Sequence, residues 1–103
     1  MAKEYSLVLF EDIEQKIFHI RGLRVMIDRD IADLYQVGAK QLNRQVKRNR
    51  ERFPAEFMFQ LTSKEKEQLV TNWDRFKSPK HSTTRPYAFT EHGILMLSSV
   101  LNS

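Results

Sequence analysis

Basic side chains are concentrated in one segment of the chain, and binding of a polyanion is the chemistry that such a segment supports. Residues 40–52 hold six Lys or Arg and one Glu, whereas residues 1–39 hold five basic and seven acidic residues. A local excess of positive charge is typical of a surface that meets nucleic acid. The alternative is a solvated helix face without a ligand, and charge alone does not separate the two.

The residue types in this segment also match what DNA recognition requires. Gln and Asn side chains can pair with adenine, and Arg with guanine, each through two hydrogen bonds. Long basic side chains reach phosphates, which positions the protein but reads no sequence. The candidates for base contacts are Lys40, Gln41, Asn43 and Arg44, and the candidates for phosphate contacts are Lys47, Arg48, Arg50 and Arg52.

A second basic cluster follows in residues 75–85, which hold four Lys or Arg and no acid. If the flanking segments 57–61 and 87–89 pair as strands, this loop becomes a wing that could contact phosphate or the minor groove. The alternative is a solvated loop that touches nothing. The basic residues of the loop are Arg75, Lys77, Lys80, His81 and Arg85, of which Lys77, Lys80 and Arg85 are candidate DNA contacts.

Other kinds of chemistry find little support. The chain has no cysteine, which excludes disulfides, thiolate nucleophiles and Cys-based zinc sites. Its three histidines lack metal-ligand spacing, and no phosphate-binding glycine loop is present. Asp28, Asp30 and Asp33 could hold the divalent ion of a nuclease, but acids at a helix start more simply stabilise the helix dipole. We therefore expect no catalytic residue, no metal and no cofactor.

The basic segment needs a scaffold, and hydrophobic periodicity predicts a helix-turn-helix. Residues 29–36 carry apolar residues at helical spacing, with Asp28 as N-cap. Residues 39–52 form a second helix, whose apolar and basic residues fall on opposite faces of a helical wheel. A tight turn near Val37 and Gly38 joins the two. In this layout the second helix lies in the major groove of DNA, braced by the first.

Short strands and further helices are expected around this unit. Residues 11–16 could form a short helix, and the β-rich runs 17–20 and 24–27 flank Gly22, which predicts a hairpin. The later elements expected are a strand at 57–61, a helix opened by a capping box from Thr62 to Glu65, a strand at 87–89, and a helix at 91–101 capped by Thr90.

The composition predicts one small domain. The chain has 103 residues, 41% hydrophobic and 29% charged, which suits a single core. No apolar run approaches the length of a membrane span, and acids follow the short apolar stretch near the N-terminus. We expect a cytoplasmic protein without membrane association. Residues 1–12 would be an extension and residues 13–103 the domain, the N-terminal part of a longer protein.

Three stretches resemble a known family. They read IRGLRVMIDRDIADLYQV, LNRQVKRNRERFPAEFMFQLT and PYAFTEHGILMLSSVLNS. They are similar to the N-terminal DNA-binding domain of phage antirepressors and their prophage copies, of the ORF-six N-terminal type, related to KilA-N and baculovirus-repeat domains. The resemblance covers about residues 13–103. It implies a DNA-binding module, usually followed by a variable C-terminal region. The turn position that is often Gly-Val in such proteins is Gln36-Val37 here.

Together these features predict an α+β domain that contains a helix-turn-helix and short strands or wing-like hairpins. The leading hypothesis for function is sequence-specific binding of double-stranded DNA in a phage or prophage transcription regulator, with residues 39–52 in the major groove. The alternative is an interaction module of an antirepressor that docks an acidic protein partner. A homodimer and a protein partner bound through a missing C-terminal region are further expectations. The expected dimer surface is the apolar face of the last helix, with Ile94, Leu95, Leu97 and Leu101, and the alternative is that this face packs against the continuation of a longer chain.

Overall fold

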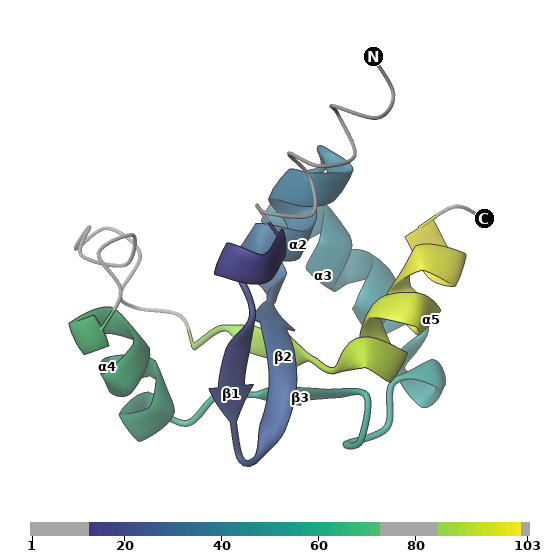
Figure 1. Ribbon diagram of the computed structural model, residues 1–103. Coiled ribbons are helices and arrows are strands. Elements are labelled where there is room, and N and C mark those ends of the chain that lie inside the picture. The colour runs from purple at the N-terminus through teal and green to yellow at the C-terminus, as the bar shows by residue number, and fades with distance from the viewer. Residues whose placement is uncertain (1–12, 73–84, 102–103) are drawn as a thin grey trace.

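The computed structural model describes residues 13–72 and 85–101, which form helices around a four-stranded antiparallel sheet (Figure 1). The predicted α+β class is therefore confirmed. A helical turn at residues 13–15 precedes the first strand. The strands are β1 (Phe18–Ile20), β2 (Leu23–Ile27), β3 (Met58–Gln60) and β4 (Tyr87–Phe89). The helices are α2 (Asp28–Tyr35), α3 (Ala39–Arg48), the 3-10 turn η1 (Arg50–Arg52), α4 (Ser63–Asn72) and α5 (Glu91–Leu101).

The sheet has the order β1-β2-β4-β3, so that the strand nearest the C-terminus lies inside it. Phe89 of β4 is paired with Met26 of β2 on one side and with Met58 of β3 on the other. The predicted pairing of the segments 57–61 and 87–89 is confirmed. Because α4 and the following residues stand between β3 and β4 in the sequence, this pair is joined by a long excursion rather than by a tight turn.

Helices cover both faces of the sheet, and the strand residues alternate accordingly. Successive side chains of a strand point to opposite faces. In β2, Val25 and Ile27 belong to a core with Leu69 of α4, whereas Met26 belongs to the core with α2, α3 and α5. In Figure 1, α4 stands on one side of the strands and α2, α3 and α5 on the other. The larger core contains Met26, Ile31, Ala32, Leu42, Val46, Phe53, Phe89, Leu97 and Val100.

The predicted hairpin turns at two residues of positive φ. Arg21 has φ 58° and Gly22 has φ 74°. Two-residue hairpin loops with both central residues left-handed match the twist of the strands, and glycine adopts this conformation without strain. Gly22 therefore lies in the turn, as the sequence indicated. Arg21 is also left-handed, although it is not a glycine.

The hairpin tip is attached to α4 by a charged contact. The Arg21 guanidinium donates to both carboxylate oxygens of Glu65, at 2.8 Å and 3.0 Å, and lies 4.0 Å from the ring centre of Phe59. The capping box is confirmed, since Glu65 N donates to Thr62 Oγ1 and Thr62 N donates to Glu65 Oε1. The hydrogen bond from Arg21 lowers the pKa of Glu65 from 4.5 to about 2, more than its burial raises it.

The boundaries of α2 differ from the prediction at both ends. Asp28 is not the N-cap. The helix begins at Asp28 itself after an extended Ile27, because the Asp28 carboxylate is buried and accepts hydrogen bonds from other elements. At the other end Gln36 takes the left-handed conformation, with φ 58° and ψ 42°. The left-handed residue of the predicted turn is therefore Gln36, whereas Gly38 has φ −73° and precedes α3 in extended form.

The predicted helix over residues 39–52 is too long. Helix α3 ends at Arg48, and Asn49 leaves helical geometry with φ −118° and ψ 35°. The Asn49 side-chain amide donates to the Gln45 carbonyl at 2.8 Å, which caps the last turn through the side chain. Asn competes with the backbone for such hydrogen bonds and so favours helix ends. A single 3-10 turn, η1, then leads to the buried Phe53, which meets Phe89 edge to face.

Helix α5 begins as predicted, at a Thr90 cap. The Thr90 hydroxyl accepts from Gly93 N at 3.3 Å and donates to Glu56 O at 2.8 Å. A Cβ atom at Gly93 would lie only 2.0 Å from Phe57 O, so this position admits no side chain. The buried side of α5 holds Gly93, Leu97 and Val100. Leu95, which the sequence placed on the apolar face, is 70% exposed, because it points away from this side.

Candidate nucleic-acid interface

Helix α3 is held by apolar contacts on one face only. Leu42 and Val46 are buried in the larger core, beside Ile31 of α2 and Leu97 of α5. The side of α3 that faces away from this core is polar and exposed. The helix is therefore fixed in place through its narrow apolar seam, and its outer side chains reach solvent, as the helical wheel predicted.

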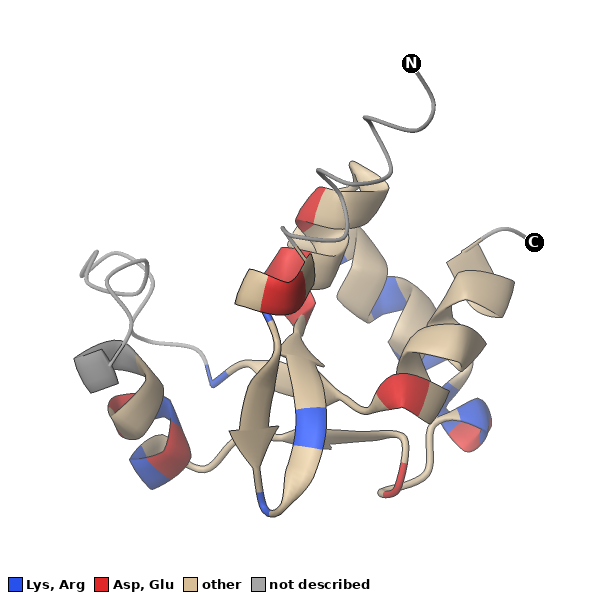
Figure 2. Ribbon diagram, viewed as in Figure 1, with Lys and Arg blue, Asp and Glu red and all other residues tan. Residues whose placement is uncertain are grey.

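The outer side of α3 carries cations that have no acidic partner within residues 13–72 and 85–101. Four basic side chains of α3 and two of η1 are exposed. Figure 2 marks Lys and Arg positions along these elements in blue. Among the described residues, none of the six makes an ion pair. Uncompensated cations at one surface attract polyanions and raise their association rate. We call these six residues the basic face: Lys40, Arg44, Lys47, Arg48, Arg50 and Arg52.

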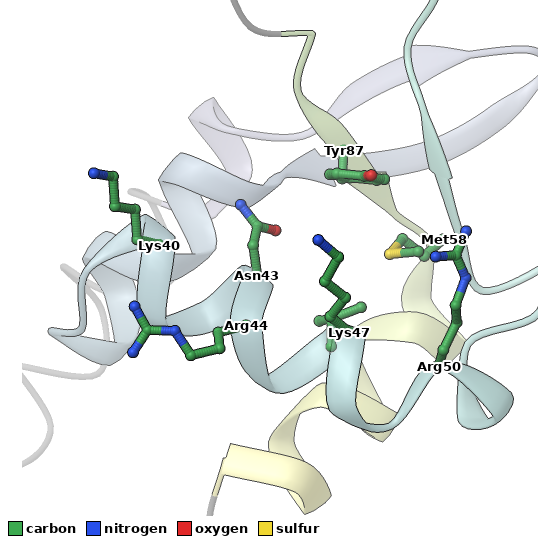
Figure 3. Close-up of a pocket in the computed structure, with 8 residues that line it drawn as sticks. Lys40, Asn43, Arg44, Lys47, Arg50, Met58 and Tyr87 are labelled. Carbon is green, nitrogen blue, oxygen red and sulfur yellow. The ribbon is translucent and has the colours of Figure 1, made fainter.

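Part of the basic face borders a pocket between α3 and the β3–β4 edge of the sheet. The pocket has a volume of about 390 Å³. Figure 3 shows Lys47 and Arg50 extending from α3 and η1 toward the side where Tyr87 and Met58 lie. Cationic side chains, one aromatic ring and one thioether thus share one concave site. The lining residues are Lys40, Asn43, Arg44, Val46, Lys47, Arg50, Met58 and Tyr87.

Sequence reasoning missed two residues of this pocket, Met58 and Tyr87. The sequence predicted both only as residues of short strands, at 57–61 and 87–89. They reach the pocket because β3 and β4 pair and because this edge of the sheet packs beside α3. The predicted pairing of the two strands was the available signal, but their position relative to α3 depends on the packing of the whole core.

A buried carboxylate connects α2, α3 and β4 behind the pocket. Asp28 is 5% exposed. Its Oδ2 accepts from Asn43 Nδ2 at 3.2 Å and from Tyr87 N at 3.3 Å, and its Oδ1 accepts from Arg29 N at 2.7 Å. Burial raises the pKa of Asp28, and the hydrogen bonds from Asn43, Tyr87 and Arg29 oppose this rise. Asp28 thus links the start of α2 to a pocket residue of α3.

The other predicted contacts lie apart from the pocket. Gln41 is exposed on the opposite flank of α3, where it lines a separate depression of about 290 Å³ with Gln45 and Leu101. Arg85 is exposed and donates to Leu61 O at 3.4 Å, near the end of β3. The candidates Lys77 and Lys80, together with Arg75 and His81, lie outside the described residues. The structure therefore places one of the three candidate wing contacts and leaves that contact outside the pocket.

The family relation follows from comparison with known proteins. A model of the ORF6N domain matches residues 15–100. The chain belongs to the ORF6N domain family. This confirms the resemblance to the N-terminal domains of phage antirepressor-type proteins, which the three stretches indicated. No curated protein and no solved structure matches the chain.

The ORF6N region includes the complete basic face and the pocket. Every lining residue, from Lys40 to Tyr87, lies within the matched residues. In the described part of this ORF6N domain, no three His, Asp or Glu side chains are grouped as ligands for a metal ion. Across the same residues, no helix combines the length and the apolar character needed to cross a bilayer.

Proposed function

We propose that this ORF6N domain binds double-stranded DNA sequence-specifically, with α3 in the major groove, as part of a phage or prophage transcription regulator. The observation that carries the proposal is the basic face, which holds six exposed cations without acidic partners among the described residues. The proposed activity is binding in the cytoplasm, without catalysis or cofactor. The alternative from the sequence, an acidic protein partner, uses the same charges.

Helix α3 has the geometry that groove binding requires. It is anchored on one side by Leu42 and Val46 and is braced by α2, which leaves its opposite side accessible. In helix-turn-helix proteins, residues near the start of the second helix meet base edges while other cations meet phosphates. Lys40 stands in the first turn of α3, Arg44 near its middle, and Lys47 and Arg48 in the last turn.

The pocket extends the proposed interface beyond α3. Arg50 of η1 and Tyr87 of β4 stand at its rim with Lys47 (Figure 3). With α3 in the major groove, the sugar-phosphate backbone at one edge of the groove would lie beside these side chains. Arg, Lys and Tyr all contact phosphates frequently. The interface would therefore comprise a helix in the groove and a flank that holds one backbone.

The test is the fluorescence anisotropy of a labelled mixed-sequence duplex of about 25 base pairs, titrated with the domain at several salt concentrations. Each phosphate that is neutralised contributes about −0.9 to the slope of log affinity against log salt. We expect a slope that corresponds to several phosphates. No binding at low salt would contradict the proposal, and capture of an acidic protein in the same conditions would favour the alternative.

Variants locate the binding surface. The double variant Arg44→Ala/Lys47→Ala should weaken DNA binding at least about tenfold and should reduce the salt slope by about two. Lys64→Ala removes one cation from α4, on the other face of the sheet, and is the matched control. It should leave both the affinity for DNA and the salt slope nearly unchanged. Unchanged affinity in a folded Arg44→Ala/Lys47→Ala variant would remove α3 from the interface.

A further inference from the structure

The side-chain amide of Asn43 has one defined orientation. Its Nδ2 donates to Asp28 Oδ2, at 3.2 Å. The same carboxylate also receives backbone N–H groups from Arg29 and Tyr87. Both Asp28 oxygens accept hydrogen bonds from N–H groups, so the carboxyl group meets the NH2 end of the Asn43 amide rather than its carbonyl end. Asp28 is buried, and its position is set by the backbone of two elements.

The carbonyl oxygen of Asn43 is consequently left for a ligand. Asn43 lines the pocket and is half-buried. Figure 3 shows this oxygen on the side of Lys47 and Tyr87, with the nitrogen turned away. No donor among the described residues bonds to it. One hydrogen-bond acceptor therefore faces a pocket whose other polar groups include the cations Lys40, Arg44 and Arg50.

This combination defines the chemistry of a matching ligand. The cations favour phosphate, whereas a carbonyl oxygen repels phosphate and requires a hydrogen-bond donor. Duplex DNA offers both kinds of group side by side. In the major groove, the amino groups of adenine N6 and cytosine N4 are the base donors, while guanine and thymine present acceptors at the corresponding positions.

We propose that Asp28 positions Asn43 so that its carbonyl oxygen accepts a hydrogen bond from the amino group of one adenine or cytosine, which excludes guanine and thymine at that position. This inference rests on the proposed DNA binding and assigns one element of its specificity. It replaces the two-bond pairing of Asn43 with adenine that the sequence suggested, because Nδ2 is already engaged by Asp28. Asn43 is the specificity-determining residue, and Asp28 is a positioning residue.

The first experiment locates the base. Selection of duplexes from a random library gives the target site of the wild-type domain, and the same selection is repeated with Asn43→Ala. We expect one position with a preference for A or C that disappears in the variant. Gln45→Ala is the matched control, since Gln45 is a half-buried amide on the other flank of α3, and it should retain the preference.

The second experiment removes the amino group from the DNA. The adenine or cytosine at that position is replaced by the analogue that lacks only its exocyclic amino group. Wild-type affinity should fall about fivefold, the effect of one hydrogen bond of ordinary strength. The Asn43→Ala variant should show no further loss, because the two changes remove the same interaction. An equal loss in both proteins would overturn the inference.

The role of Asp28 has its own readouts. In Asp28→Asn, either end of the Asn43 amide can face residue 28, so discrimination against G and T should shrink while the salt slope stays constant. In the wild-type domain, the Asn43 side-chain NH2 should exchange with solvent more slowly in nuclear magnetic resonance than that of the exposed Gln41. Equal exchange of the two amides would overturn the positioning role, even if Asp28→Asn does not fold.

The outcomes separate this inference from the proposed function. Absence of duplex binding at low salt overturns both. Salt-dependent binding without a position that prefers A or C, or with a preference that persists in Asn43→Ala, overturns this inference and leaves the proposed function in place.

Discussion

On one face of the sheet Arg21 of the hairpin is paired with Glu65 of α4, whereas on the other face the six cations of the basic face have no acidic partner among the described residues. Arg21 and Glu65 form a two-bond ion pair across the hairpin tip and α4. Lys47 and Arg50 line a pocket instead. Paired charges stabilise the position of an element, and unpaired charges remain available for a ligand.

The two faces also differ in what positions their helices. Helix α4 opens with a side-chain capping box and is held by the Arg21 contact. Neither α2 nor α3 has a side-chain N-cap. Near α3, the left-handed Gln36 and the close approach of Gly93 to Phe57 O determine the path of the chain. The α3 face is thus positioned by backbone geometry, apolar packing and the buried contact between Asp28 and Asn43, which leaves its cationic side chains for binding.

The largest effect is expected at Gly93, on which the α3 face depends. Gly93→Ala would place a Cβ against the Phe57 carbonyl, and the free energy of unfolding should fall by about 3 kcal/mol. Urea denaturation measures the change. Gly38→Ala is the control, because no atom lies within 4 Å of its added Cβ and its φ is ordinary. Similar losses in the two variants would contradict the structural role of Gly93.

At Gln36, in the turn between α2 and α3, a substitution by glycine should stabilise the domain. A side chain in the left-handed conformation costs about 1 kcal/mol or more, so Gln36→Gly should raise the free energy of unfolding by about 0.5 kcal/mol after the entropy of glycine is included. Thermal denaturation measures the gain. Gln45→Gly, inside α3, should lower stability by about 1 kcal/mol. A loss in Gln36→Gly would show that the turn differs from the geometry described.

Glu65 has two roles on the α4 face, the ion pair with Arg21 and the capping box with Thr62, and one variant distinguishes them. Glu65→Gln keeps the capping bond to Thr62 N but removes the charge that Arg21 meets, so stability should fall by only about 0.5 kcal/mol. Affinity for DNA should not change, since the pair lies on the other face from α3. A clear loss of DNA binding in this variant would break the proposed division between the two faces.

The dependence of that pair on pH gives the smallest effect. The pKa of Glu65 is lowered from 4.5 to about 2 in the folded protein, so the pair stabilises fully above pH 4.5 and is lost as pH falls toward 2. The difference in stability between wild type and Glu65→Gln should therefore close in this range. The raised pKa of Asp28 has the opposite effect, since it increases the free energy of unfolding as pH falls. Asp28 is present in both proteins, so its contribution cancels in the difference between them. A gap that does not shrink as pH falls from 4.5 to 2 would contradict the assignment.

Features whose cause lies within a few residues could be predicted from the sequence. Gly22 in the hairpin turn, the box from Thr62 to Glu65 and the Thr90 cap all depend on neighbouring residues, and the structure confirms them. The outward display of the basic residues of α3 followed from helical periodicity. The family relation was also evident in the residues, because the resemblance covered nearly the whole chain.

Features that depend on distant partners could not be predicted. Asp28 reads locally as an N-cap, but its carboxylate is used by Asn43 and Tyr87, which are far away in the sequence. Met58 and Tyr87 reach the pocket only through sheet pairing. The end of α3 at Arg48 was missed because the helical pattern continues through Arg52, and the local competition of Asn49 ends the helix first.

The order of the strands has a consequence for how the chain folds during synthesis. The β1–β2 hairpin and the α2–α3 unit need only local contacts and can form as soon as they leave the ribosome. The inner edge of β2 must wait for β4, because Met26 and Ile27 pair with Phe89 and Ala88, which are far away in the sequence. Until then an apolar strand edge is open to other chains. The late closure by Tyr87–Phe89 ends the exposure of this strand edge to aggregation, and α5 then adds Leu97 and Val100 to the larger core.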